Sequence, residues 1–199
     1  MREIEREEQT LKGNWYRGIA LDIHTISSTK LDEYHFNNKR SEIGQLVYDI
    51  KYDNTLSLED KDKKASELAR IVPNCIKKPD TFDVMVPVPF SKNRDFQPVY
   101  EILIKVANLL KKPIDLQYIK KIGQTPELKS IDSIKEIQNT LKGKFDVSLK
   151  YANKNIFLFD DVYSSGSTLK EVTKTLYNKG KVHKVFVMTL TKTRTKNNF

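Results

Sequence analysis

The sequence is short of cysteine, of long apolar runs and of glycine and proline, and each shortage excludes a class of protein. Cys75 is the single cysteine among 199 residues, which excludes an intramolecular disulfide and a cysteine-based zinc site. The three histidines lie far apart, without the short spacings that metal sites need. The longest apolar runs, such as residues 156–159, are far too short to span a bilayer. With 7 glycines and 7 prolines, the chain is not of low complexity.

What remains is the composition of a folded, basic protein. Hydrophobic residues make up 38 %, which suits one core, and the net charge of +9 favours anionic partners. Residues 1–8 carry four glutamates and no apolar stretch, so they do not form a secretory signal. We therefore expect a soluble, cytoplasmic protein that does not associate with membranes.

Apolar periodicity predicts strands that alternate with helices. Ser41 is expected to cap a helix with an apolar stripe from Ile43 to Ile50. The other predicted helices cover residues 60–71, 98–110 with Leu109 buried, 131–141 and 168–179. Longer strands are predicted at 15–25, 82–88, 156–159 and 182–190, with short ones at 116–119 and 147–149. Residues 1–12 are expected to be helical or frayed. The pattern predicts an α/β fold with a mainly parallel sheet flanked by helices.

Residues 156–168 contain the clearest functional motif, Ile-Phe-Leu-Phe-Asp-Asp-Val-Tyr-Ser-Ser-Gly-Ser-Thr. The apolar run predicts a buried strand whose carboxyl end lies at the ligand-binding edge of an α/β sheet. Asp160 and Asp161, expected to be exposed there, can accept hydrogen bonds from ribose hydroxyls or from water on Mg²⁺. The turn 164–168 offers hydroxyls and backbone amides, Gly166 allows an anion to approach, and a helix follows. Carboxylates followed by an amide cradle indicate a ribose 5-phosphate site.

This motif resembles the binding motif for 5-phosphoribosyl-1-pyrophosphate (PRPP) of type I phosphoribosyltransferases. Over about residues 43–191 the chain also resembles the ComF-like branch of that superfamily. The matching segments are Tyr-Asp-Ile-Lys-Tyr at 48–52, Asp-Val-Met-Val-Pro-Val-Pro at 83–89 and Arg-Asp-Phe-Gln at 94–97. The resemblance implies one phosphoribosyltransferase-like domain at 41–199, with a small hood at about 116–149. Residues 1–40 form an N-terminal extension with one or more strands and no assigned role.

The resemblance also implies roles for individual residues. Asp160 and Asp161 would be the catalytic carboxylates and would hold the ribose hydroxyls, directly or through Mg²⁺ as cofactor. The 5-phosphate would be bound by Tyr163, Ser164, Ser165, Gly166, Ser167 and Thr168. The pyrophosphate would be bound after the first buried strand by Ser91, Lys92, Asn93 and Arg94. The hood would close over the substrate and exclude water.

The sequence departs from the family at several places. The zinc-binding cysteine cluster with which ComF-like proteins often begin is missing. The Thr-x-x-Gln of the family's hood is Thr125-Pro126-Glu127-Leu128 here, and its downstream arginine has no counterpart. Ser164 stands where purine-salvage members have an aspartate that exchanges a proton with the purine, and a serine does not ionise near neutral pH. We therefore expect an acceptor other than hypoxanthine or guanine.

Two functions stay open at this point. One is a Mg²⁺-dependent phosphoribosyltransferase, a glycosyltransferase for pentosyl groups, which the complete motif favours. The other is a binder that senses PRPP or a nucleotide, has lost turnover and acts in DNA uptake or processing. The losses in the hood and the net charge of +9 favour this second function. Weak nucleic-acid binding and a homodimer are also left open.

Overall fold

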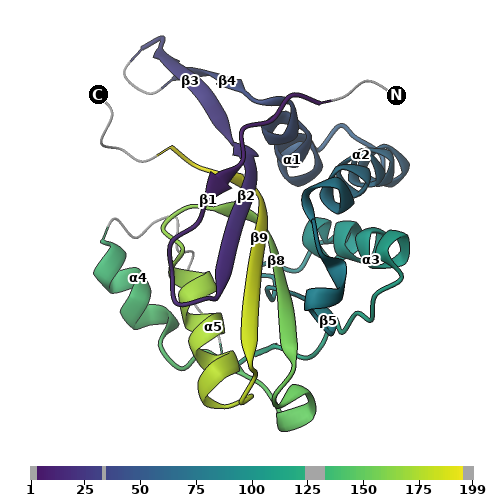
Figure 1. Ribbon diagram of the computed structural model, residues 1–199. Coiled ribbons are helices and arrows are strands. Elements are labelled where there is room, and N and C mark those ends of the chain that lie inside the picture. The colour runs from purple at the N-terminus through teal and green to yellow at the C-terminus, as the bar shows by residue number, and fades with distance from the viewer. Residues whose placement is uncertain (1–3, 33–34, 124–132, 195–199) are drawn as a thin grey trace.

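The central sheet has five strands in the order β1-β2-β9-β8-β5 (Figure 1). The computed structural model describes residues 4–32, 35–123 and 133–194 of the chain. The strands are β1 (Gln9–Thr10), β2 (Arg17–Ile23), β9 (Lys184–Lys192), β8 (Asn155–Tyr163) and β5 (Val84–Pro87). All neighbouring pairs are parallel except β1 and β2. The mainly parallel sheet predicted from the sequence is confirmed.

Helices cover both faces of this sheet (Figure 1). One face carries α1 (Glu42–Tyr52), α2 (Leu58–Ile71) and α3 (Pro98–Leu110). The other carries α5 (Ser167–Asn178), against which α4 (Ile134–Leu141) packs. Ser41 caps α1 as predicted, because its Oγ accepts a hydrogen bond of 3.0 Å from the backbone N–H of Gly44. Short 3₁₀ turns lie at Val72–Cys75, Pro79–Thr81 and Leu149–Tyr151.

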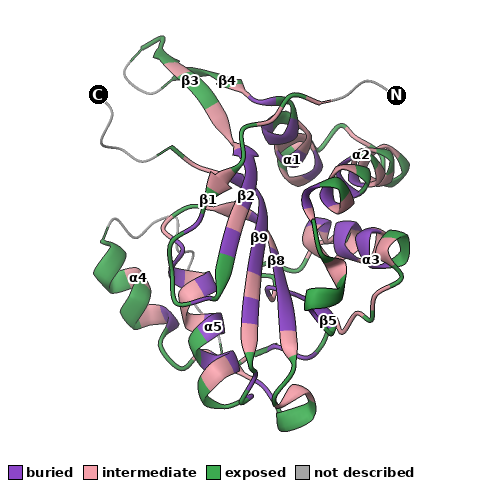
Figure 2. Cartoon of the chain, in the orientation of Figure 1, coloured by how far each residue is buried: buried purple, intermediate pink, exposed green. Residues whose placement is uncertain are grey.

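The core lies on both sides of the central strand β8 (Figure 2). Ile156 and Leu158 belong to the apolar cluster that includes the inner face of α5. Phe157 and Phe159 belong to the cluster formed with α1, α2 and α3. Because β8 is covered on both faces, it is apolar at every position from 156 to 159 rather than at every second one.

Several sequence-based expectations are wrong in detail. Residues 116–119 and 147–149 are not strands, because Tyr118, Ile119 and Val147 pack their side chains into the α5 cluster without a sheet partner. The short strands of this region are β6 (Lys120–Lys121) and β7 (Phe145–Asp146), which pair with each other. Leu109 is 55 % exposed, since α3 buries its other side.

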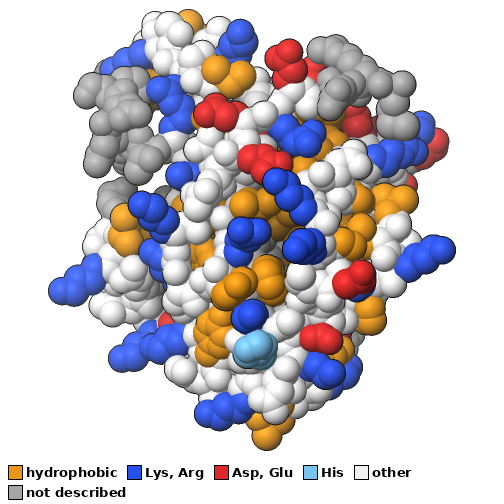
Figure 3. Space-filling view, in the orientation of Figure 1, with side chains coloured by type: hydrophobic (Ala, Val, Ile, Leu, Met, Phe, Trp, Pro, Cys, Tyr) orange, Lys and Arg blue, Asp and Glu red, His pale blue; other side chains and the backbone are white. Residues whose placement is uncertain are grey.

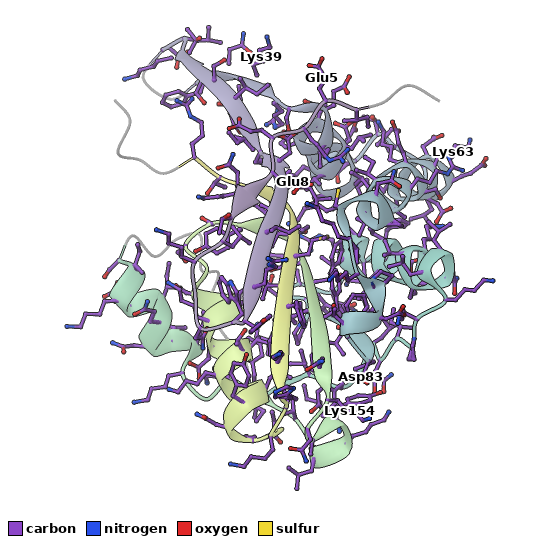
Figure 4. All side chains as sticks on the ribbon, viewed as in Figure 1. Glu5, Glu8, Lys39, Lys63, Asp83 and Lys154 are labelled. Carbon is purple, nitrogen blue, oxygen red and sulfur yellow. The ribbon has the colours of Figure 1, made fainter. Side chains whose placement is uncertain are left out.

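The N-terminal extension contributes directly to the sheet. Residues 9–10 form β1 instead of a helical start, because Gln9 and Thr10 pair with β2. β2 itself lies parallel to β9. A two-stranded ribbon of β3 (Thr25–Lys30) and β4 (Phe36–Arg40) then projects from the molecule, with Lys39 near its base, in register with Ser27 (Figure 4 labels Lys39). Among the described residues, no helix is long and apolar enough to span a bilayer.

Candidate functional site

The residues of the sequence motif lie at the carboxyl end of β8, in the middle of the parallel strands. Asp160 and Asp161 are near the end of β8, the turn 164–166 follows, and α5 begins at Ser167. The loop after the neighbouring strand β5 leaves the sheet at the same edge. At the opposite edge the acidic side chain Asp83 accepts a hydrogen bond of 2.7 Å from the backbone N–H of Asn155 (Figure 4 labels Asp83). The fold therefore places the two predicted binding loops together at the carboxyl edge.

Asp161 is paired with a lysine that the sequence did not place in the site. Lys51, in the last turn of α1, has its Nζ 2.7 Å from Oδ2 of Asp161. The Asp161 residue is only 8 % exposed, so the expectation of an exposed carboxylate is wrong for this residue. Burial by itself lowers the pKa of Lys51, but the charge of Asp161 and its hydrogen bond outweigh this and raise that pKa. Through this ion pair, α1 holds the Asp161 carboxylate in place.

Asp160 is in a different electrostatic state from its neighbour. Desolvation is the main cause that raises the pKa of Asp160 to about 8, and the negative charge of Asp161 adds to it. The positive charge of Lys51 and a 2.9 Å hydrogen bond from the Asp161 backbone N–H act in the opposite direction and are weaker. At neutral pH, Asp160 is therefore mostly a neutral acid that can donate as well as accept hydrogen bonds.

The turn before α5 is shaped by Gly166 and Tyr163. Gly166 has a φ of 71°, which is unfavourable for residues with a side chain, and it stands at the cap position of α5. A Cβ added there would lie 2.5 Å from Cε2 of the Tyr163 ring. Glycine is thus required by its backbone angle and by the tyrosine ring. The sequence indicated the need for a glycine here, but it did not predict the contact with the Tyr163 ring.

The serines of the turn bond with each other. Ser165 Oγ donates to Ser167 Oγ at 2.9 Å and accepts at 3.3 Å from the backbone N–H of Ser167. Ser164 is exposed, and Thr168 lies half-buried in the first turn of α5. The amides of this first turn lack partners within the helix and carry its positive end, which suits an anion. The turn thus has the chemistry of a phosphate cradle.

The predicted pyrophosphate loop is on the surface beside this cradle. Ser91, Lys92 and Asn93 are exposed and Arg94 is half-buried. Its shape depends on a residue to which the sequence analysis gave no role. Gln97 Nε2 lies within 3.2 Å of the Lys92 carbonyl oxygen and 3.3 Å of the Arg94 carbonyl oxygen, to which it donates. The quoted segment 94–97 was the signal that could have identified it.

Part of the predicted hood is outside the described residues, as is part of the basic C-terminal segment that carries Lys192, Arg194 and Lys196. The segment Thr125–Leu128 and Lys196 fall there. Of the described hood, Ser133 caps α4 by accepting a 3.4 Å hydrogen bond from the backbone N–H of Glu136. Arg194 in the tail donates to the backbone oxygen of Ile26, at the base of the β3–β4 ribbon, over 3.0 Å.

Comparison with known proteins supports the fold. No family model matches the sequence, and no curated protein matches it. The glutamine PRPP amidotransferase from B. subtilis, complexed with ADP and GMP, matches with a TM-score of 0.51 and 15 % identity over 80 % of this chain and 35 % of that one. A structure described as the allosteric regulatory enzyme of purine biosynthesis matches with a TM-score of 0.50 and 15 % identity, over 96 % and 36 %.

The chain has a type I phosphoribosyltransferase fold. An adenine phosphoribosyltransferase is also similar, with a TM-score of 0.43 and 12 % identity over 82 % of this chain and 84 % of that one. The present chain spans about a third of the length of the amidotransferase and of the regulatory enzyme. At such low identity the likeness shows the fold, and the ComF-like branch stays a prediction.

In this phosphoribosyltransferase fold, polar residues extend the site across two further strands. Thr189 on β9 is in register with Asp160, and Asp22 on β2 is in register with Thr191. All four residues therefore face the α5 side of the sheet at its carboxyl end. Asp22, Thr189 and Thr191 are buried, and Oδ2 of Asp22 has no hydrogen-bond partner among the described residues. Asp22 and the two threonines were missed because they continue apolar strands in the sequence.

Proposed function

We propose that this protein binds PRPP and acts as a Mg²⁺-dependent phosphoribosyltransferase on an acceptor that is not a purine. The observation that carries the proposal is the position of Asp160 and Asp161 at the carboxyl end of the central strand, directly before a glycine turn and a helix N-terminus. A diol-binding pair of carboxylates and an anion cradle next to each other fit a ribose 5-phosphate.

The described residues suggest a division of roles. Asp161, held by Lys51 at 2.7 Å, is a fixed acceptor for a ribose hydroxyl. The pKa of Asp160 is raised to about 8, so its carboxyl group can donate a hydrogen bond. It can also lose its proton when a cation binds nearby. As pyrophosphate leaves the anomeric carbon, positive charge develops on the ribose ring, and these carboxylates can stabilise it. Gln97 holds the loop that would bind the leaving pyrophosphate.

The donor set is compatible with Mg²⁺. In proteins this ion is usually held by one or two carboxylates together with substrate phosphates and water. The described residues contain no group of three or more histidine, cysteine or acidic side chains placed to hold a metal ion, so this part of the chain offers no complete metal cage of its own. Asp160 is the better ligand of the two, since Asp161 is already paired with Lys51. When bound, Mg²⁺ supplies charge neutralisation for the departing pyrophosphate.

The acceptor is inferred from Ser164. This side chain is exposed at the position where a purine-salvage enzyme places a proton-exchanging aspartate. A serine does not perform that exchange near neutral pH. We propose an amine or an already ionised ring as the nucleophile, since neither needs a protein base at this position.

Calorimetric titration with PRPP and Mg²⁺ tests the binding step. Asp160→Asn should weaken binding about tenfold or more by removing the ionisable ligand. Asp80→Asn is the matched control, because the Asp80 side chain is 95 % exposed and pairs with Lys112 away from the site. No heat and no thermal stabilisation with millimolar PRPP and Mg²⁺ would refute the proposal. Pyrophosphate release from PRPP should then be followed across a panel of amines and bases to identify the acceptor.

The alternative is a PRPP or nucleotide sensor without turnover that acts on nucleic acid. The net charge of +9 favours it. On the face shown in Figure 3, however, Lys and Arg are spread over the surface with acidic side chains among them.

Salt dependence separates the two functions. A weak, non-specific interaction with DNA should vanish by about 150 mM salt, where screening acts over roughly 8 Å. Replacing Lys192, Arg194 and Lys196 by Ala should not affect PRPP binding. A nanomolar complex with DNA that persists at this salt concentration, together with no pyrophosphate release, would favour the sensor.

A further inference from the structure

A groove of about 550 Å³ runs between α4 and α5, and the phosphoribosyltransferase reaction proposed above makes no use of it. We call it the α4–α5 groove. The loop before β2 contributes Gly13 and Asn14 to its lining. Its lining residues are Gly13, Asn14, Gln138, Asn139, Lys142, Ser167, Lys170, Glu171 and Lys174. Neither Asp160 nor Asp161 is among them, so the groove is distinct from the candidate ribose site.

The charge of the groove is strongly positive. Lys170 and Lys174 are four residues apart on α5 and so share one face of that helix, while Lys142 follows the last residue of α4. None of these three lysines has an ion pair in the described part of the chain. The single acidic lining residue, Glu171, accepts a hydrogen bond of 2.9 Å from the backbone N–H of Gly143. The lining therefore has three ammonium groups and one carboxylate, that of Glu171, which already accepts a hydrogen bond.

The neutral lining residues are mostly hydrogen-bond donors. Gln138 and Asn139 bring side-chain amides from α4. Asn14 donates to the backbone oxygen of Lys170 at 3.0 Å, which holds the loop before β2 against α5. Ser167 adds a hydroxyl to the lining. Ammonium groups, amides and a hydroxyl are the groups that bind phosphate oxygens.

The size and the lining narrow the class of ligand. A volume of about 550 Å³ is in the range of small-molecule sites and exceeds the need of a single phosphate. None of the lining residues is aromatic, and none is a large aliphatic side chain. A nucleobase would therefore find neither a stacking partner nor an apolar wall.

We propose that the α4–α5 groove binds a small anion with two or more phosphate groups and no aromatic base. The site is separate from the phosphate cradle and touches it only through Ser167, the first residue of α5. This inference goes beyond the proposed transferase function and does not depend on it, because every lining residue except Ser167 lies outside the phosphate cradle.

Inorganic tripolyphosphate is a suitable probe. Its binding is measured by calorimetric titration in Mg²⁺-free buffer at low salt, once without ribose 5-phosphate and once with a saturating concentration of it. The test variant is Lys170→Gln with Lys174→Gln. The matched control is Lys77→Gln with Lys135→Gln, which removes the same charge from two exposed lysines outside the groove. We expect the test variant to bind tripolyphosphate at least about tenfold more weakly than the wild type, and the control to stay within about twofold.

Four further results decide the matter. Binding that survives saturation with ribose 5-phosphate supports a separate groove site. If the control variant loses as much affinity as the test variant, the probe responds only to the net charge of the protein, and the proposal is overturned. ATP is compared with tripolyphosphate in the same way. If the wild type binds ATP with higher affinity and the test variant loses this difference, the statement that the ligand lacks a base is overturned. Absence of any tripolyphosphate binding to the wild type overturns the whole inference.

Discussion

Lys51 Nζ lies 2.7 Å from Oδ2 of Asp161, and this contact joins α1 to the carboxyl end of the central strand. Their side chains are 17 % and 11 % exposed, so the pair is partly shielded from water. In such surroundings a charge left without its partner costs more than at the surface. The contact thus links a feature of the candidate site to the stability of the fold.

Replacing Lys51 by Met should destabilise the protein by about 2–3 kcal/mol, because the Asp161 carboxylate then stays buried without a countercharge. Chemical unfolding at pH 7 measures the change. Lys63→Met is the control, since the Lys63 side chain is 66 % exposed and its pair with Glu59 is screened by solvent and contributes little to stability. The double variant Lys51→Met with Asp161→Asn should recover part of the loss. Equal effects of Lys51→Met and Lys63→Met would contradict the role of the pair.

Asp160 should make stability depend on pH. Its pKa of about 8 in the folded protein is above the ordinary value of 3.8, so between these pH values the folded state keeps a proton that the unfolded chain has lost. The free energy of unfolding therefore falls as the pH rises through this window. Asp160→Asn should remove this dependence and stabilise the protein at pH 8 relative to wild type, by about 1–3 kcal/mol. Urea unfolding at pH 5 and pH 8 gives the comparison, and parallel pH profiles of variant and wild type would refute it.

The same protonation state predicts a signature of ligand binding. A cation near Asp160 favours the ionised carboxylate, so binding of PRPP with Mg²⁺ at pH 7 should release close to one proton. Calorimetry in buffers of different ionisation enthalpy counts that proton. In Asp160→Asn the release should disappear while any remaining binding heat becomes independent of buffer. Proton uptake by the wild type on binding would contradict the predicted proton release.

Gly166 can be tested against a glycine of similar backbone angle. Gly166 and Gly143 have φ values of 71° and 69°, but only at Gly166 would a Cβ meet another side chain, the Tyr163 ring. Both Gly→Ala changes should cost about 1–2 kcal/mol for the left-handed angle, and Gly166→Ala should cost more because of the ring. Adding Tyr163→Ala to Gly166→Ala should remove that excess. If the two single variants were equally stable, the ring would not constrain the turn.

The sequence predicted the sheet, the main helices and the carboxyl-edge site because these depend on local patterns. The apolar run at 156–159 identifies a doubly covered strand, and Ser41 identifies a helix start. It did not predict contacts between segments distant in the chain. Lys51 precedes Asp161 by more than a hundred residues, and β2 reaches the sheet from an extension without a recognisable motif. Such contacts depend on tertiary packing, which no local spacing records.

The last prediction concerns the loop that would bind pyrophosphate. Gln97→Met keeps the size of the side chain but removes the amide that donates to the carbonyl oxygens of Lys92 and Arg94. Since the loop is exposed, thermal stability should change by no more than about 0.5 kcal/mol. A looser loop must be ordered when the ligand binds, so affinity for pyrophosphate should fall roughly threefold to tenfold. Gln117→Met, at an exposed position away from this loop, should leave affinity unchanged. Wild-type affinity in Gln97→Met would mean that the loop is held by other contacts and that Gln97 does not organise the site.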